Sequence, residues 1–180
     1  MKIPKKVKEI QENLTKMESD CKSISYSQLS VYTSCPLCWY RSYIKKEAPF
    51  VPSIHTVFGT SIHETLQKWL DLLYNDSVKA AMAFDTSSYL MERLKENYGS
   101  DRESLGKDYS SAKELTEFYE EGVAILDYVK KWRVRYFDRK DVFLVGCELP
   151  LLVPIGSNFY FKGFIDCLLY DESLDRWTIL

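Results

Sequence analysis

The sequence predicts an α/β fold in which the N-terminal two thirds is mostly helical and the C-terminal part forms a mixed β-sheet. Before residue 141, apolar residues recur at three- and four-residue spacing, which indicates amphipathic helices. After residue 141, β-branched and aromatic runs alternate with Pro, Gly, Asn and Asp, which indicates strands and turns. A length of 180 residues suits one domain with a real core. We therefore expect one domain over 23–180, preceded by an amphipathic helix within 1–22.

Composition excludes several classes of protein. The chain is 46% hydrophobic and 28% charged, which is ordinary for a globular protein, and no apolar run approaches the roughly 18 residues that a membrane span needs. The basic start is followed by Glu9 and Glu12 instead of an apolar stretch, so it does not resemble a secretory signal. Five cysteines without such a signal favour reduced thiols. We expect no membrane segment and a location inside the cell.

The first 56 residues predict short helices and one loop. Val7 and neighbouring apolar positions predict an amphipathic helix over 5–18. Ser27 is suited to cap a second helix that ends near Cys35, and a third can begin at Pro36, because proline is tolerated in a first turn. Prolines without periodicity predict a loop over 47–56.

Longer helices are predicted in the middle of the chain. Apolar spacing predicts helices over 59–73 and from about 78 to 97, followed by a polar loop over 101–111. A long helix is predicted from 115 to 136, and cations over 135–140 suit the dipole at its C-terminal end.

The last forty residues predict strands and one hairpin loop, over residues 171–175. The predicted strands are 142–145, 149–153, 159–161, 165–170 and 177–180. Because native termini usually lie in polar residues outside the core, a strand-like run that reaches Leu180 leads us to expect a truncated chain whose C-terminal core is missing.

Two acidic residues in this region are candidates for chemistry. Asp166 lies inside an apolar strand, where burial of a carboxylate costs free energy unless a cation or hydrogen-bond donors satisfy it. The alternative is a strand-end aspartate that caps a turn or meets an arginine. Spacing alone does not decide between these two interpretations of Asp166. Glu148 could be a further metal ligand or an acid beside the ligands, but an exposed strand glutamate is the favoured interpretation.

One histidine is a third candidate. His63 is expected one turn into a helix, where a neutral imidazole can project into a cleft and bind manganese beside carboxylates. A packed or surface histidine is the alternative. Glu64 is interpreted as a solvated helix residue, and His55 is assigned nothing.

Three stretches, taken together, resemble the RecB, AddB and Cas4-like exonuclease branch of the PD-(D/E)XK nuclease superfamily, which is common in bacteria and phages. The first runs from Ser25 to Tyr43 and has the order Ser-x-Ser-x-Leu, Tyr, Cys-Pro, then aromatics. The second is Phe58 to Glu64, with Gly-x-x-x-His at the start of the helix. The third leads to Gly163-Phe164-Ile165-Asp166.

The resemblance implies a restriction-endonuclease-like core and a metal-dependent DNA nuclease, an exonuclease or end-processing enzyme of recombination, repair or phage replication. It implies His63 and Asp166 as ligands of Mg²⁺ or Mn²⁺, with Glu148 as a further catalytic residue. It also implies DNA as partner, a helicase or recombination protein as a possible second one, and the cytoplasm of a bacterium or phage-infected cell as the location.

The family's next motif is Asp or Glu, one residue, then Lys, about fifteen positions beyond the first carboxylate and so past Leu180. Within the 180 residues, no such motif follows Asp166. We therefore expect weak or absent nuclease activity from this chain alone. Two other hypotheses stay open: a non-catalytic DNA-binding or protein-interaction module, and one half of a split nuclease that a second polypeptide completes.

Two further sets of residues are candidates for binding. Phosphate contacts and base stacking are expected from Lys130, Lys131, Trp132, Arg133 and Arg135, although a cationic helix terminus explains the same run.

The second set is cysteines. The resemblance allows Cys35 to be one ligand of a 4Fe-4S cluster, but only if the chain is part of a longer parent protein that supplies the other ligands. Cys147 and Cys167 lie in predicted strands and are interpreted as core residues.

Overall fold

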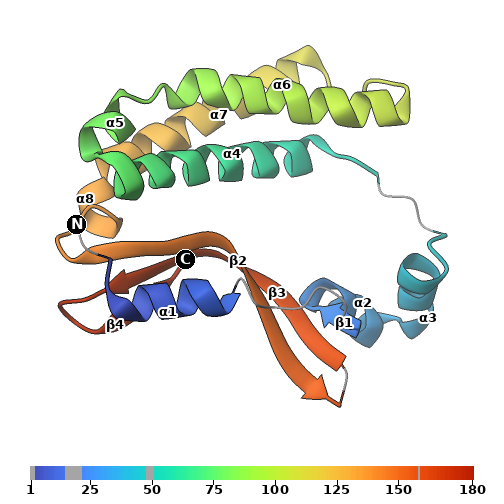
Figure 1. Cartoon of the computed structure of the whole chain (residues 1–180). Helices are drawn as coiled ribbons and strands as arrows, with labels where there is room; N and C mark the ends of the chain where they lie inside the picture. Colours follow the sequence, from blue (N-terminus) through green and yellow to red (C-terminus); the bar gives the residue numbers. More distant parts are fainter. Residues whose placement is uncertain (1–2, 15–21, 48–50, 158) are drawn as a thin grey trace. The chain divides into compact units, whose positions relative to one another are not determined.

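The structure is a computed structural model of the chain, and it describes residues 3–14, 22–47, 51–157 and 159–180 (Figure 1). The chain divides into two compact units. The sheet unit comprises Met1–Phe50 with Asp141–Leu180, and the helical unit comprises Val51–Lys140. Helices and a mixed sheet of four strands are both present, so the predicted α/β class is confirmed. Among the described residues, no helix has the length and apolar character to cross a membrane.

The sheet is organised around one long strand. Its strands are β1 (Lys22–Ser25), β2 (Val142–Gly156), β3 (Phe159–Asp171) and β4 (Arg176–Ile179). β2 runs antiparallel along most of β3, and the two form a long pair (Figure 1). β1 pairs in parallel with β3 at Phe159–Lys162, and β4 pairs antiparallel with its far end, from Leu168 to Asp171. The central strand therefore carries the candidate Asp166.

The predicted short strands are joined into longer ones. The runs 142–145 and 149–153 belong to the single strand β2, and 159–161 and 165–170 both belong to β3. Pro150 lies on β2, which pairs with β3 alone among the described strands, and prolines within sheets are found mainly on such edge strands. A register shift between Leu144 and Gly146 marks a β-bulge. The hairpin loop is confirmed as the turn between β3 and β4.

Helix α1 (Lys5–Leu14) confirms the first part of the predicted amphipathic helix, and residues 15–18 lie outside the described residues. Val7 is fully buried in a cluster with apolar side chains of β2 and β3. The members of this cluster are Val7, Phe143, Val145, Leu168 and Tyr170. Gln11 also donates a hydrogen bond from Nε2 to the backbone oxygen of Val145, over 2.7 Å. The apolar stripe of α1 thus covers the sheet of its own unit.

The short helices α2 (Tyr26–Ser34) and α3 (Pro36–Trp39) follow β1, and a π-helical turn (Tyr40–Ile44) continues α3. Ser25, and not Ser27, caps α2: its backbone is extended, and its hydroxyl accepts a hydrogen bond from the Gln28 amide. The predicted cap was wrong because Ser27 already has helical geometry. Pro36 begins α3, as predicted, because its fixed φ and missing N–H suit a first turn.

The helical unit contains longer helices. They are α4 (Ile54–Asp71), a π-helical turn (Leu72–Asp76), α5 (Val78–Ala83), α6 (Thr86–Leu105), α7 (Ala112–Lys131) and α8 (Arg133–Tyr136). Helices α4, α6 and α7 pack against one another around a shared apolar cluster (Figure 1). Its buried members are Val57, Leu90, Leu94 and Leu126.

Helix boundaries in this unit differ from the predicted ones where polar caps decide them. Ser53 caps α4, so residues 54–56 are helical and not part of a loop. Asp85 caps α6, which divides the single helix expected over 78–97 into α5 and α6. Helix α6 also continues through the start of the expected loop and ends at Gly106, whose φ of 67° closes the helix in a left-handed conformation.

Candidate metal site

Glu148 and Asp166 lie directly opposite each other on neighbouring strands. The β2–β3 register pairs Cys147 with Cys167 and Leu149 with Ile165, which places Glu148 across from Asp166. Carboxylate oxygens of the two residues lie within 4.8 Å of each other, and both residues are exposed. The pair has the donor chemistry that a hard divalent cation prefers.

The backbone at Glu148 has an unusual conformation. Its φ is 51°, in the left-handed region that residues other than glycine rarely adopt. The residue stands a few positions after the β-bulge near Val145, where the strand is already irregular. Strained backbone of this kind is concentrated at functional sites, because the surrounding structure must hold it in place. The sequence carried no signal for this feature.

Asp166 stands where the pairing on one edge of β3 changes partner. β1 pairs with β3 up to Lys162, and pairing on that edge resumes at Cys167, whose backbone bonds Leu180. Among the described residues, no strand pairs with β3 between these points on that edge. A Cβ built on Gly163 meets no atom within 4 Å, so nothing in the structure requires a glycine there.

His63 belongs to the helical unit and lies on α4. The expectation that it stands one turn into a helix was wrong: because α4 begins at Ile54, His63 lies well inside it and is half-buried. Glu64, expected to be solvated, is also half-buried and accepts a hydrogen bond from Asn97, Nδ2 to Oε2, over 3.3 Å. Asn97 also donates to the buried Ser61 hydroxyl. This packing fixes the part of α4 that carries His63.

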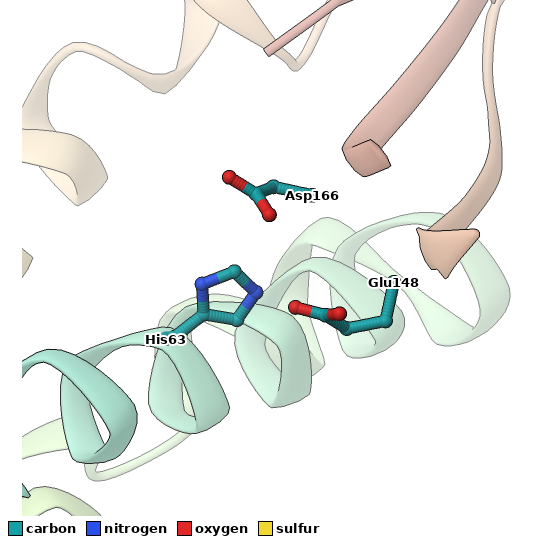
Figure 2. A group of neighbouring side chains, drawn as sticks. All are labelled: His63, Glu148 and Asp166. Atoms are coloured by element: carbon teal, nitrogen blue, oxygen red, sulfur yellow. The ribbon is translucent and has the colours of Figure 1, made fainter. Parts of the chain in front are cut away.

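The three candidate ligands are labelled in Figure 2. Glu148 and Asp166 come from the sheet unit, and His63 comes from the helical unit. His55, which the sequence left unassigned, is exposed in the first turn of α4 and meets the Phe118 ring edge-on at 5.1 Å. It therefore packs within its own unit.

The cationic run near the end of α7 divides into two kinds of residue. Lys130 donates from Nζ to the backbone oxygen of Phe84 at 3.0 Å and to the Thr86 hydroxyl at 3.3 Å. Arg133 pairs with Asp138 across 3.2 Å, and both side chains are largely buried. Lys130 and Arg133 therefore make polar contacts within the helical unit.

The other members of the run face solvent. Trp132 and Tyr136 are each 41% exposed. The Lys131 ammonium lies 5.9 Å from the centre of the Trp132 ring, and the Arg135 guanidinium lies 5.6 Å from that of Tyr136. Exposed cations beside exposed aromatic rings match the phosphate and base chemistry of nucleic acids.

Cys35 and Cys38 form a local pair at the start of α3. The Cys35 sulfur caps this helix by accepting a hydrogen bond from the Cys38 amide, N to Sγ, over 3.3 Å. Hydrogen bonding with the Cys38 thiol is the main cause that lowers the pKa of Cys35. Capping accounts for Cys35 in the described structure, and a cluster ligand stays a prediction.

Paired carboxylates on adjacent strands of a mixed α/β sheet provide the oxygen ligands that a divalent cation prefers. The sequence model of the PD-(D/E)XK nuclease superfamily matches residues 23–180. The chain belongs to this superfamily, whose members are generally nucleases and typically use divalent metals. Neither a search of curated proteins nor one of solved structures returned a match.

Proposed function

We propose that the protein is a metal-dependent deoxyribonuclease that hydrolyses phosphodiester bonds in DNA, as an exonuclease or end-processing enzyme. Membership of the PD-(D/E)XK superfamily supports the class of reaction. The observation that carries the proposal is the pair of opposed carboxylates, Glu148 and Asp166, whose oxygens lie within 4.8 Å of each other.

Glu148 and Asp166 would hold Mg²⁺ or Mn²⁺, with His63 as an additional ligand. Carboxylate oxygens suit either cation, and an imidazole beside carboxylates is an acceptable ligand for Mn²⁺. The bound cation would polarise the scissile phosphate and make an attacking water more acidic. The motif around His63 supports its part in the set, and the register of β2 and β3 supports the part of the two carboxylates.

The strands would position the metal ligands. Glu148 and Asp166 stand on strands that pair on both sides of them, so the two carboxylates are brought together before any ligand arrives. Preorganised ligands lower the cost of binding, because little motion has to be frozen.

Lys131, Trp132 and Arg135 would contact the DNA. Their side chains are exposed, and the cations lie beside aromatic rings. Lysine and arginine neutralise phosphates, and the tryptophan can stack on an unpaired base. Lys130 and Arg133 were predicted to share this task, but their internal hydrogen bonds and ion pair favour a structural one.

Metal binding tests the site directly. The 180-residue protein is titrated with Mn²⁺, and free Mn²⁺ is followed by electron paramagnetic resonance. Asp166→Asn and Glu148→Gln should each weaken binding at least about tenfold, because even changes next to a ligand typically cost that much. Glu172→Gln is the matched control, because it removes an exposed carboxylate in the β3–β4 turn. Equal Mn²⁺ affinity in all four proteins would contradict the proposed site.

Hydrolysis is tested on end-labelled linear DNA with Mg²⁺ or Mn²⁺. We expect slow cleavage from this polypeptide alone, because no Asp-x-Lys or Glu-x-Lys follows Asp166 within it to orient the attacking water. Fast cleavage that Asp166→Asn abolishes would contradict the expected slowness and support the nuclease. If the protein binds DNA and cleaves none in any metal, the non-catalytic module becomes the better hypothesis.

The biological setting is also a proposal. The stretches around Ser25, His63 and Asp166 support the RecB-like branch, with work in recombination, repair or phage replication in the cytoplasm. A helicase would be a natural partner for such an enzyme. Addition of a second polypeptide that carries the Asp-x-Lys motif should restore cleavage if the nuclease is split.

A further inference from the structure

Two cysteines lie next to the candidate metal ligands and face each other across the sheet. Cys147 on β2 pairs in register with Cys167 on β3. Each is the sequence neighbour of a candidate ligand, since Cys147 precedes Glu148 and Cys167 follows Asp166. Both are present as thiols, Cys147 half-buried and Cys167 buried.

The backbone hydrogen bonds identify the kind of cross-strand pair. The amide of Cys167 donates to the Leu180 oxygen at 3.2 Å, and the Cys167 oxygen accepts from the Leu180 amide at 3.0 Å. Both polar groups of Cys167 therefore point away from β2. Cys147 and Cys167 form the non-hydrogen-bonded type of antiparallel pair, in which Cα atoms approach to about 4.5 Å and side chains are closest.

This spacing suits a disulfide. The distance between Cα atoms across a disulfide is usually about 4.4–6.8 Å, a range that includes the non-hydrogen-bonded pair. A hydrogen bond joins the Cys147 and Cys167 thiols, so the two side chains are in contact.

We propose that Cys147 and Cys167 are an oxidative modification site that closes to a reversible disulfide. With a peroxide as oxidant, the more accessible Cys147 thiol takes up one oxygen to give a sulfenic acid, and one water is released from hydrogen peroxide. The Cys167 sulfur then displaces the hydroxyl group from the Cys147 sulfur. The hydroxyl leaves with the Cys167 proton as a second water, so two thiols and one peroxide give one disulfide and two waters.

The consequence for the metal site rests on the proposed function. A covalent link beside Glu148 and Asp166 would hold β2 and β3 at one fixed separation and twist. Because Glu148 already has a φ of 51°, its carboxylate depends on the local backbone geometry. We expect the oxidised protein to bind Mn²⁺ several-fold more weakly than the reduced protein, and dithiothreitol to restore binding.

The disulfide is tested by peptide mapping, without any measurement of activity. The variant Cys21→Ser/Cys35→Ser/Cys38→Ser leaves the two cysteines of interest. After mild peroxide treatment, it should lose both remaining free thiols. Trypsin cuts after Lys140, Lys162 and Arg176, so the two cysteines fall in separate peptides that should remain joined until dithiothreitol is added.

Cys147→Ser in the same background is the matched control, and it should retain one thiol and give no joined peptide. Unjoined peptides that each carry added oxygen, or two thiols that persist in peroxide, would overturn the proposal. The Mn²⁺ titration distinguishes failure of the proposed function from failure of the disulfide proposal. If neither the reduced nor the oxidised protein binds Mn²⁺ while the peptides are joined, the proposed function fails and the disulfide stands.

Discussion

Glu148 faces Asp166 across the β2–β3 pairing with its own backbone in a left-handed conformation, at a φ of 51°. Two exposed carboxylates are thus held close together at a position where the strand itself is strained. The left-handed backbone costs stability. Paired carboxylate oxygens are the ligands that a hard divalent cation prefers, which is why the pair supports the proposed metal site.

Backbone strain at Glu148 predicts that glycine is better tolerated there than alanine. Gly adopts a positive φ without steric cost, whereas alanine has a Cβ that opposes it. Glu148→Gly should therefore be more stable to urea than Glu148→Ala by about 1 kcal/mol. Circular dichroism in urea measures the difference, and a less stable glycine variant would argue against the assigned conformation. Neither variant should retain tight Mn²⁺ binding.

Asp175 predicts a pH dependence of stability in the sheet unit. Hydrogen bonds from Lys6 and then Tyr170 lower the pKa of Asp175 below its ordinary value. A carboxyl whose folded pKa is lowered contributes stability above the unfolded pKa of about 4, and that contribution is lost as pH falls through the folded pKa.

Wild type should therefore melt at a higher temperature than Asp175→Asn at pH 7, and the gap should close in acid. Differential scanning calorimetry at several pH values measures it. Glu172→Gln, in the same turn, serves as the control and should show no such gap. A gap for Asp175→Asn that stays constant with pH would mean that the amide disrupts the turn in another way.

From the close packing of helix α7 at Gly122 we expect a larger side chain there to lower the stability of the protein. A Cβ built on this residue of α7 would lie 2.6 Å from Cδ2 of Leu90, a side chain that is fully buried. Gly122→Ala should therefore destabilise the protein by about 1–3 kcal/mol, although alanine favours helices.

The matched control is Gly99→Ala on α6, where the built Cβ meets nothing within 4 Å. This change should leave stability unchanged or raise it by up to about 1 kcal/mol. Urea denaturation of both variants decides the matter. Equal stabilities would show that α7 can shift to accept a methyl group at the helix crossing.

From the exposed positions of Lys131 and Arg135 we expect both residues to contribute to DNA affinity. Each lies exposed beside an aromatic ring, so the double variant Lys131→Ala/Arg135→Ala should weaken binding to a labelled oligonucleotide. The slope of log affinity against log salt concentration should also fall, by the amount expected for the loss of about two phosphate contacts. Fluorescence anisotropy at several salt concentrations measures both quantities. An unchanged salt slope would place the DNA elsewhere.

Lys130→Ala is the comparison, because its ammonium is bonded to the Phe84 oxygen and the Thr86 hydroxyl. This variant should lower the melting temperature and leave the salt slope nearly as in the wild type. If Lys130→Ala weakens DNA binding as strongly as the double variant without a change in melting temperature, Lys130 contacts DNA and does not have a structural role.

Much of the fold could be predicted from local patterns. The change from helical to strand periodicity near Asp141 fixed the fold class, because periods of 3.6 and 2 residues reflect which face of an element is buried. Boundaries were harder. Asp85 divided one expected helix into two, because a single side-chain cap can decide where a helix begins and such caps compete with propensity.

The sequence predicted the individual residues of the candidate site, but it did not predict how they are arranged in space. The motifs named His63, Glu148 and Asp166. Nothing in the sequence set Glu148 directly opposite Asp166, since register depends on a bulge near Val145 and on pairing along the whole of β3. The same reason explains why Cys147 and Cys167 were interpreted as core residues and their pairing across β2 and β3 was not predicted.

By itself, then, the sequence determined the helical and strand-forming regions, the superfamily motifs and the chemistry of the candidate ligands, because these follow from local composition and spacing. Tertiary structure decided which residues meet. It placed ligand atoms of Glu148 and Asp166 within 4.8 Å of each other. It also gave the Lys130 ammonium a hydrogen bond to the Phe84 backbone oxygen, while Lys131 faces solvent. Contacts between residues far apart in the chain depend on register and packing, which no local pattern specifies.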